Sequence, residues 1–237
     1  MNKLLIGLAF FVPMAGLAGG CGLLDATDGI TISLPTQEFE FELDANQARS
    51  QLEQALNDEL PQGMSLDLSG EEEIPQQVCD GQGNCVDVPT VEQTFTFDLP
   101  PQQVDLSDED ELKKYVEAGK VREVTIEFVT YDLTQNSLNF NLPEIELYMD
   151  ALEAEEISDS SDKVAVMPAI EAGQTGEGQL QFTQNGRQIM SNYLLGYTFA
   201  MLGRTSYTID TAVTRTIPQG MLRGVIAMQL SFKVDPL

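Results

Sequence analysis

The sequence contains no histidine and no tryptophan among its 237 residues. Without histidine, catalytic triads that use an imidazole base are excluded, and so is any zinc site that needs imidazole ligands. Basic residues are also few, because 12 lysines and arginines stand against 38 acidic residues, for a formal net charge of −26. A surface this acidic repels phosphate groups, which excludes nucleic-acid binding through a basic face. We therefore expect a non-catalytic protein without a cofactor.

The first 20 residues have the features of an export signal. Lys3 precedes an apolar run over residues 4–17, and Ala18, Gly19 and Gly20 follow that run. This order of charge, apolar run and small residues is typical of a secretory signal peptide. The run is shorter than the roughly 20 residues that a membrane-spanning helix needs. We therefore expect residues 1–20 to be removed on export.

Cys21 follows the small residues directly. Residues 17–21 resemble the lipobox of bacterial lipoproteins, although leucine stands four places before the cysteine rather than the usual three. The resemblance implies that Cys21 is acylated and anchors the protein, with residues 21–29 as a tether. Gly22 replaces the aspartate of inner-membrane retention, so the resemblance favours the outer membrane of a bacterial cell envelope. The alternative is an ordinary signal peptide that leaves Cys21 as a spare thiol.

The other two cysteines, Cys79 and Cys85, enclose a turn-forming segment of aspartate, glycine, glutamine and asparagine. In an exported protein this spacing predicts a disulfide that closes a hairpin. A redox site would need the CxxC spacing, and a metal site would need further sulfur or imidazole ligands. We therefore predict a structural disulfide and no metal site.

Alternation of apolar and polar residues at period 2 predicts about nine strands. Strands are expected at 30–34, 39–43, 64–68, 121–133 and 145–149, and a further strand at 91–99 is expected to end at Pro100 and Pro101. Two antiparallel hairpins are expected, one centred near Asn136 and one that pairs residues 205–216 with 221–234. Residues 138–142 also alternate and should extend the first hairpin.

Three segments show helical spacing instead. Residues 46–60 predict an amphipathic helix that ends at Pro61, and residues 108–118 predict a helix with a capping box at Ser107. Residues 186–202 are apolar around most of the helical circumference, which predicts a buried helix ended by Gly203.

Together these elements predict a mainly β, sandwich-like fold with about three helices; the alternative is an α+β fold with a helix packed on an antiparallel sheet. Residues 30–237 are expected to form one β-rich domain, with a sub-boundary near residue 100 as the alternative. Residues 121–150 resemble the sandwich modules of late-embryogenesis-abundant-like domains, which implies a binding or stress module. No site residue carries over from that resemblance.

The abundant acidic clusters suit calcium ligands, but none follows the twelve-residue calcium-loop pattern. They lie at residues 71–73, 105–111 and 153–162. Paired carboxylates also suit glycoside hydrolysis, but a chain without tryptophan lacks the aromatic platform typical of sugar sites.

The sequence thus predicts a lipid-anchored envelope protein that binds a partner or supports an assembly. Its partners would be the membrane, through the acyl anchor, and an envelope protein or a lipid. One alternative is a periplasmic carrier of a hydrophobic ligand, with residues 186–202 and the tyrosines 193 and 197 lining or rimming its cavity. The other is a calcium-dependent adhesion module. The sequence identifies no ligand-binding residues.

Overall fold

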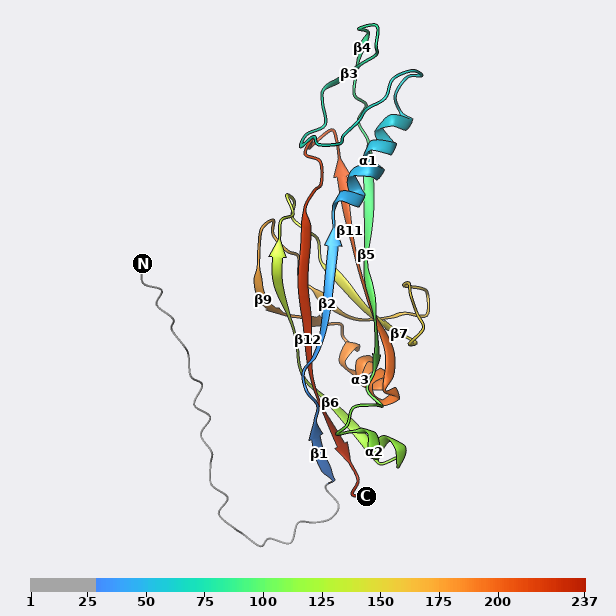
Figure 1. The fold of residues 1–237 in the computed structure, drawn as a ribbon, viewed down its shortest axis with the longest axis vertical. Coiled ribbons are helices and arrows are strands. Elements are labelled where there is room, and N and C mark those ends of the chain that lie inside the picture. Colours follow the sequence, from blue (N-terminus) through green and yellow to red (C-terminus); the bar gives the residue numbers. More distant parts are fainter. Residues whose placement is uncertain (1–28) are drawn as a thin grey trace, which may run out of the picture.

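The computed structural model describes residues 29–237, so the predictions for the signal segment and for Cys21 lie outside the described residues. Two antiparallel sheets pack face to face, with three helices around them (Figure 1). The expected mainly β, sandwich-like fold is confirmed. The inward faces of the two sheets meet in a continuous apolar core.

Strand β12 (Met221–Val234) organises the first sheet. It pairs with β6 (Val121–Asn136) along one edge, and with β1 (Ile30–Ser33) and β2 (Gln37–Asp44) in succession along the other. Strand β9 (Gly176–Gln179) adds to the far side of β6. The alternation seen in the sequence explains why this segment forms a strand of the sheet. Phe39, Phe41 and Leu43 of β2 point into the core, and the glutamates between them are exposed.

The second sheet has the order β10-β8-β7-β11-β5. Its strands are β5 (Glu92–Asp105), β7 (Ile145–Asp150), β8 (Asp162–Met167), β10 (Gln181–Phe182) and β11 (Thr198–Asp210). Phe95, Phe97 and Leu99 of β5 are buried against the first sheet. From Thr205 to Asp210, β11 pairs with β5 on one side. On its other side this part of β11 has no partner strand in the described chain.

The two sheets meet differently along their two sides. On one side the chain passes from β9 to β10 through Leu180, which joins the sheets covalently. On the other side β2 and β5 lie next to each other without backbone pairing, bridged where Gln102 Nε2 donates to the Glu40 carbonyl at 3.2 Å. The proline pair at 100 and 101 lies within β5, so the prediction that these prolines end the strand is wrong. Proline is tolerated here because the register with β11 shifts between the pairs Met201–Gln102 and Gly203–Leu99, so both prolines fall in a β-bulge and neither takes part in the pairing.

Helix α1 (Asn46–Asp58) follows β2 as predicted and buries Ala48, Leu52 and Leu56. The predicted strand at 64–68 does not form. Instead, side chains of α1 satisfy its backbone: Leu66 N–H donates to Asn57 Oδ1 at 2.6 Å, and Leu68 N–H donates to a Glu53 carboxylate oxygen at 2.9 Å. The alternating leucines therefore pack beside a helix rather than in a sheet.

Helix α2 (Lys113–Glu117) is shorter than the predicted 108–118. Ser107 does not cap it, because its hydroxyl donates to Asp105 Oδ1 at 2.6 Å instead. The helix begins after Leu112 and is followed by Gly119, which adopts a positive φ of 63°.

The apolar run 186–202 is divided between two elements, so the prediction of one long helix is wrong. Helix α3 (Gly186–Gly196) ends where Tyr197 adopts the left-handed φ of 67°, and β11 begins at the next residue. Residues 199–203 are buried on both faces of the sheet, which gives the continuous apolar run that a buried helix also shows.

Both predicted hairpins are wrong for a common reason. Strands β6 and β7 lie in different sheets, as do β11 and β12. Between β6 and β7 the chain crosses from one sheet to the other, and Leu138, Phe140 and Leu142 fill the gap with buried side chains. Apolar alternation therefore continues through residues 138–142 although this segment forms no strand.

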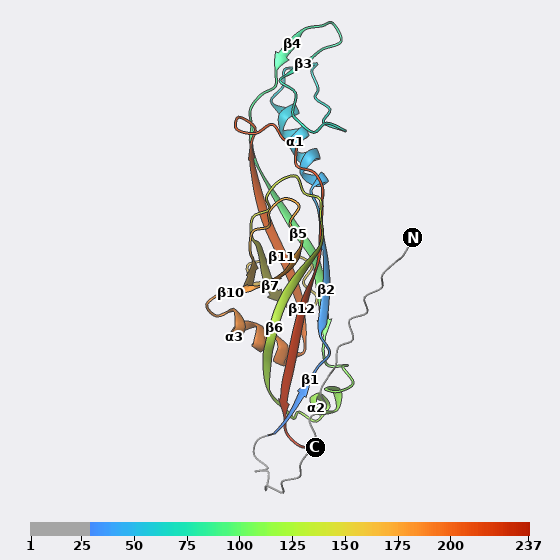
Figure 2. The same cartoon turned by 90° about the vertical axis from the view of Figure 1, so that its left-hand side faces the viewer.

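The molecule is elongated, and its two ends differ (Figures 1 and 2). Ile30 pairs with Val234, so the start of the described chain and the C-terminus lie together at one end. Helix α1 and the hairpin of β3 (Gln77–Cys79) and β4 (Cys85–Asp87) lie at the opposite end. Strand β12 alone spans about 45 Å at the usual rise per residue.

At Gly186 the backbone of α3 lies so close to β8 that we predict glycine to be required there for stability. A Cβ atom there would lie 1.8 Å from the Val164 carbonyl oxygen of β8. Gly186→Ala should lower the free energy of unfolding by about 2 kcal/mol or more through overpacking. Gly196→Ala, in the same helix, meets no atom within 4 Å and should leave stability unchanged or slightly raised. Urea unfolding of both variants checks this; equal effects would contradict it.

Candidate functional site

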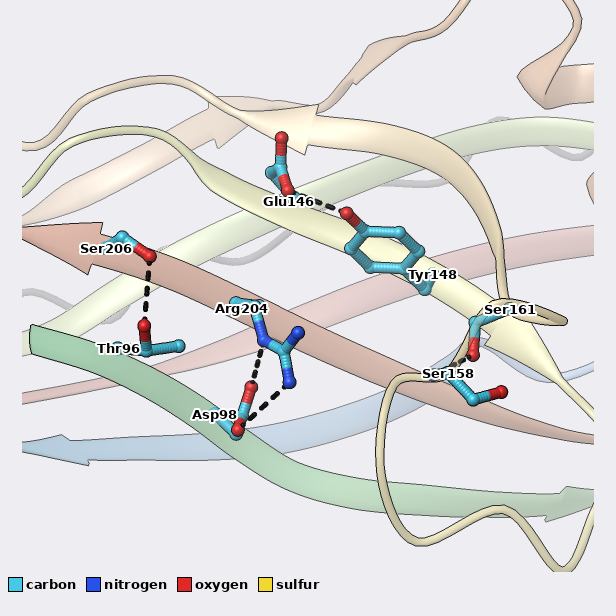
Figure 3. A network of polar contacts seen from close by, with 8 residues as sticks. All are labelled: Thr96, Asp98, Glu146, Tyr148, Ser158, Ser161, Arg204 and Ser206. Carbon is cyan, nitrogen blue, oxygen red and sulfur yellow. Dashed lines mark hydrogen bonds and ion pairs between the residues drawn. The ribbon is translucent and has the colours of Figure 1, made fainter.

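The outer face of the second sheet carries a network of polar side chains (Figure 3). Arg204 of β11 forms a bidentate ion pair with Asp98 of β5. Arg204 Nε donates to Asp98 Oδ1 at 2.6 Å, and Nη2 donates to Oδ2 at 3.3 Å. The next outward pair along these strands, Ser206 and Thr96, joins its hydroxyls at 3.3 Å. The register of β5 and β11 places these residues directly opposite one another. The network is therefore a ladder of cross-strand pairs.

Glu146 of β7 extends this network toward β8. Its carboxylate forms an ion pair with Lys163 and accepts a hydrogen bond from the Tyr148 hydroxyl at 2.7 Å. The Lys163 and Tyr148 hydrogen bonds hold the pKa of Glu146 below its ordinary value. Burial, helped by the bond to Glu146, raises the pKa of Tyr148 to about 12. Both groups therefore keep one ionisation state near neutral pH.

Asp150, at the end of β7, is 9% exposed and organises the loop before β8. It accepts hydrogen bonds from the Ser161 hydroxyl at 2.6 Å and the Ala151 N–H at 2.7 Å. The Ser161 bond is the main cause that lowers the pKa of Asp150. Ser161 is thus paired with a weak base, which does not activate a hydroxyl as a nucleophile.

The carboxyl groups whose pKa is shifted all shift in the same direction. Each carboxyl group whose pKa departs from its ordinary value departs downward, and hydrogen bonds are the leading cause in each case. These groups are Asp67, Asp80, Asp105, Glu146 and Asp150. A carboxylic acid tuned for proton transfer near neutral pH has a raised pKa instead.

The predicted disulfide between Cys79 and Cys85 is confirmed. It closes the hairpin of β3 and β4, whose strands pair at these two residues. Asp80 shapes the turn, because its carboxylate accepts bonds from the N–H groups of Gln82 and Asn84 and from the Asn84 amide at 2.8–2.9 Å. The bonds from Asn84 lower the pKa of Asp80 most strongly. The tip of the molecule is thus covalently closed and locally ordered.

The acidic clusters predicted from the sequence stay separate in the fold. Within residues 29–237 no group of three or more carboxylates and cysteines is placed to hold a metal ion. The helices of the same part of the chain include none that is long and apolar enough to cross a membrane.

The tyrosines of the apolar run have local roles. The Tyr193 hydroxyl donates to Asp162 at 3.0 Å, and burial together with this bond raises the pKa of Tyr193 to about 12. Met190 and Leu194 on the same helix are buried in the core. Clefts of about 460 and 340 Å³ lie instead along the seam of β2 and β5, around Pro100, and contain no residue of α3.

A further cavity of about 410 Å³, which we term the Tyr207 cavity, lies beside the C-terminal half of β11. Phe140, Tyr207 and Pro218 supply its less exposed surface, and Asn139, Asn141, Ala172, Thr214 and Thr216 complete the lining. Its residues come from four separate stretches of chain. Sequence reasoning missed the cavity because no local motif marks it.

Comparisons with known proteins add no family to this description. The sequence matches no protein-family model, and no curated protein matches it either.

We predict that the disulfide stabilises the tip locally. A closed loop this short removes little chain entropy, so Cys79→Ser combined with Cys85→Ser should lower the free energy of unfolding by about 2 kcal/mol at most. Limited proteolysis should show faster cleavage within residues 80–84, with the sandwich intact. The wild-type protein treated with reductant is the control and should behave like the variant. Global unfolding of the double variant would contradict a local role.

A second prediction concerns acid stability. Because the folded pKa of Glu146 is lowered, its pairing contributes stability that is present above the unfolded pKa and lost as the pH falls through the folded value. Glu146→Gln should therefore reduce stability at pH 7 and flatten its decline between about pH 5 and 3. Glu144→Gln serves as the control, since Glu144 forms no hydrogen bond or ion pair with any of residues 29–237. Denaturant unfolding at several pH values measures both; identical pH profiles of the Glu146 variant and wild type would refute the assignment.

Proposed function

We infer that this protein is a lipoprotein of the bacterial cell envelope, anchored through acylated Cys21 and acting as a non-catalytic binding module. The observation that carries the proposal is the arrangement of the two ends. The described chain starts at Gly29 beside the C-terminus, while α1, the disulfide hairpin and the Tyr207 cavity lie toward the other end. An anchor close to Gly29 would display that other end away from the membrane.

Dimensions support this orientation. The tether from Cys21 to Gly29 reaches at most about 28 Å when fully extended. Strand β12 alone extends about 45 Å beyond the β1 end. The end that bears the disulfide hairpin would therefore be farther from the bilayer than the tether is long. A net charge of −26 adds repulsion from anionic lipids within a Debye length of the surface.

The disulfide supports export. Disulfides form and persist in oxidising compartments such as the bacterial periplasm, and they are rare in the cytosol. Cys79 and Cys85 form one in this structure. The export signal in residues 1–20 and the disulfide therefore agree on the compartment. Cys21 is the remaining cysteine of the sequence and is assigned to acylation.

Replacement of the anchor tests this proposal. We expect Cys21→Ala protein, expressed in a Gram-negative host, to move from the membrane pellet to the soluble fraction and to lose incorporation of an alkyne-labelled fatty acid. Acyl chains supply the membrane affinity, and the domain itself is repelled from the bilayer.

The matched control is the double variant of Cys79 and Cys85, which keeps Cys21 and should stay in the pellet. Cys21→Ala protein that still sediments with membranes after a high-salt wash would overturn the anchor assignment.

A further inference from the structure

We propose that the Tyr207 cavity binds a neutral sugar ring, such as one unit of an envelope glycan. This inference names the class of ligand for the binding module proposed above. It rests on that proposal only for the location of the protein in the cell envelope. Its basis is the combination of an aromatic floor, a polar rim and a lining without ionised side chains.

Two aromatic rings in contact with each other form the aromatic floor, the part of the lining made by Phe140 and Tyr207. The ring centroids of Phe140 and Tyr207 lie 4.4 Å apart, with the ring planes tilted by 31°. Phe140 is buried and supports Tyr207, which is half-buried and lines the cavity. Such a ring offers an apolar surface with a polar tip. The pair supplies an aromatic platform that the absence of tryptophan had argued against.

The rim presents polar groups that the fold leaves unused. Asn141 accepts the Ala172 N–H at 3.0 Å through Oδ1, and its Nδ2 forms no hydrogen bond with any of residues 29–237. The hydroxyls of Tyr207 and Thr216 likewise form none within that range. By contrast, Asn139 uses both ends of its amide, toward Gln219 N–H and the Ile217 carbonyl, and so fixes the rim.

The lining also contains no carboxylate, ammonium or guanidinium group. An anionic ligand would find no cation there and would meet the field of a protein with a net charge of −26. A cationic ligand would find no carboxylate in the lining to pair with. Burial raises the pKa of Tyr207, so its phenol stays neutral as well. The remaining match is a neutral ligand with many hydroxyl groups.

A pyranose ring fits these features. One face of the ring is lined by C–H bonds and stacks on an aromatic side chain, while its edge carries hydroxyls that donate and accept hydrogen bonds. The cavity volume of about 410 Å³ is within the usual range of small-ligand sites. Tyr207, which lines the cavity, lies in the part of β11 that has a partner strand on one side only.

The test uses the full chain purified in a detergent that contains no sugar, with chitotetraose and maltotetraose as neutral probes and tetragalacturonate as the charged comparison. Isothermal titration calorimetry measures binding, and saturation-transfer NMR identifies the contacting ring protons. We expect at least one neutral probe to bind, and tetragalacturonate to bind at least tenfold more weakly.

Four variants assign the binding to the cavity. Tyr207→Phe and Thr216→Val each remove one hydroxyl and keep the side-chain shape, and each should weaken binding by roughly 3- to 10-fold. Asn141→Asp keeps the oxygen that accepts the Ala172 N–H but removes the free amide donor, and it should weaken binding at least as much. Ser206→Ala is the matched control, because Ser206 neighbours Tyr207 on β11 but faces the opposite side of the sheet. Circular dichroism confirms that each variant is folded.

Three results would overturn the proposal: no binding of either neutral probe at about 10 mM to folded protein, unchanged binding in all the cavity variants, or equal binding of tetragalacturonate. Each is independent of the membrane test, since purified protein binds sugar whether or not Cys21 is acylated. Failure of the sugar site therefore leaves the anchor standing, and failure of the anchor leaves the sugar site standing.

Discussion

Strand β12 pairs with β6 along one edge and with β1 and β2 along the other, so its register determines the arrangement of the whole first sheet. Side chains alternate strictly between the two faces of a strand, and a slip of one residue would exchange them. Ile226, Met228 and Leu230 then would leave the core and Arg223 would enter it. The burial of this inward set therefore specifies the register of β12, whose pairing with β1 brings Ile30 beside Val234.

Local patterns predicted the elements well and their pairing poorly. Period-2 alternation identified β2, β5 and β6, because one face of each strand is wet and the other is buried. It failed at residues 64–68, where side chains of α1 replace a neighbouring strand as hydrogen-bond partners. Strand pairing could not be predicted from local patterns for a different reason. At both predicted hairpins the consecutive strands lie in different sheets, and that arrangement depends on contacts between residues far apart in the chain.

The same distinction applies to the functional residues. The pairing of Cys79 with Cys85 was predictable because a sequence separation of 6 and a turn-forming composition bring the two sulfur atoms together. The Tyr207 cavity was not, because its aromatic pair joins residues 67 positions apart and each ring belongs to an unremarkable alternating segment. The network around Arg204 was equally hidden, since its partner Asp98 lies 106 residues earlier in the chain, and three other strands of the sheet, β7, β8 and β10, come between.

The two prolines of β5 have one more consequence. An exposed strand edge is a template on which other chains can add strands, and long flat edges promote aggregation. Neither Pro100 nor Pro101 has an N–H group, so neither residue can donate a ladder hydrogen bond to a strand added at the edge of β5. The prolines therefore interrupt the edge of β5 as a template for a further strand, at the place where β2 already lies beside it.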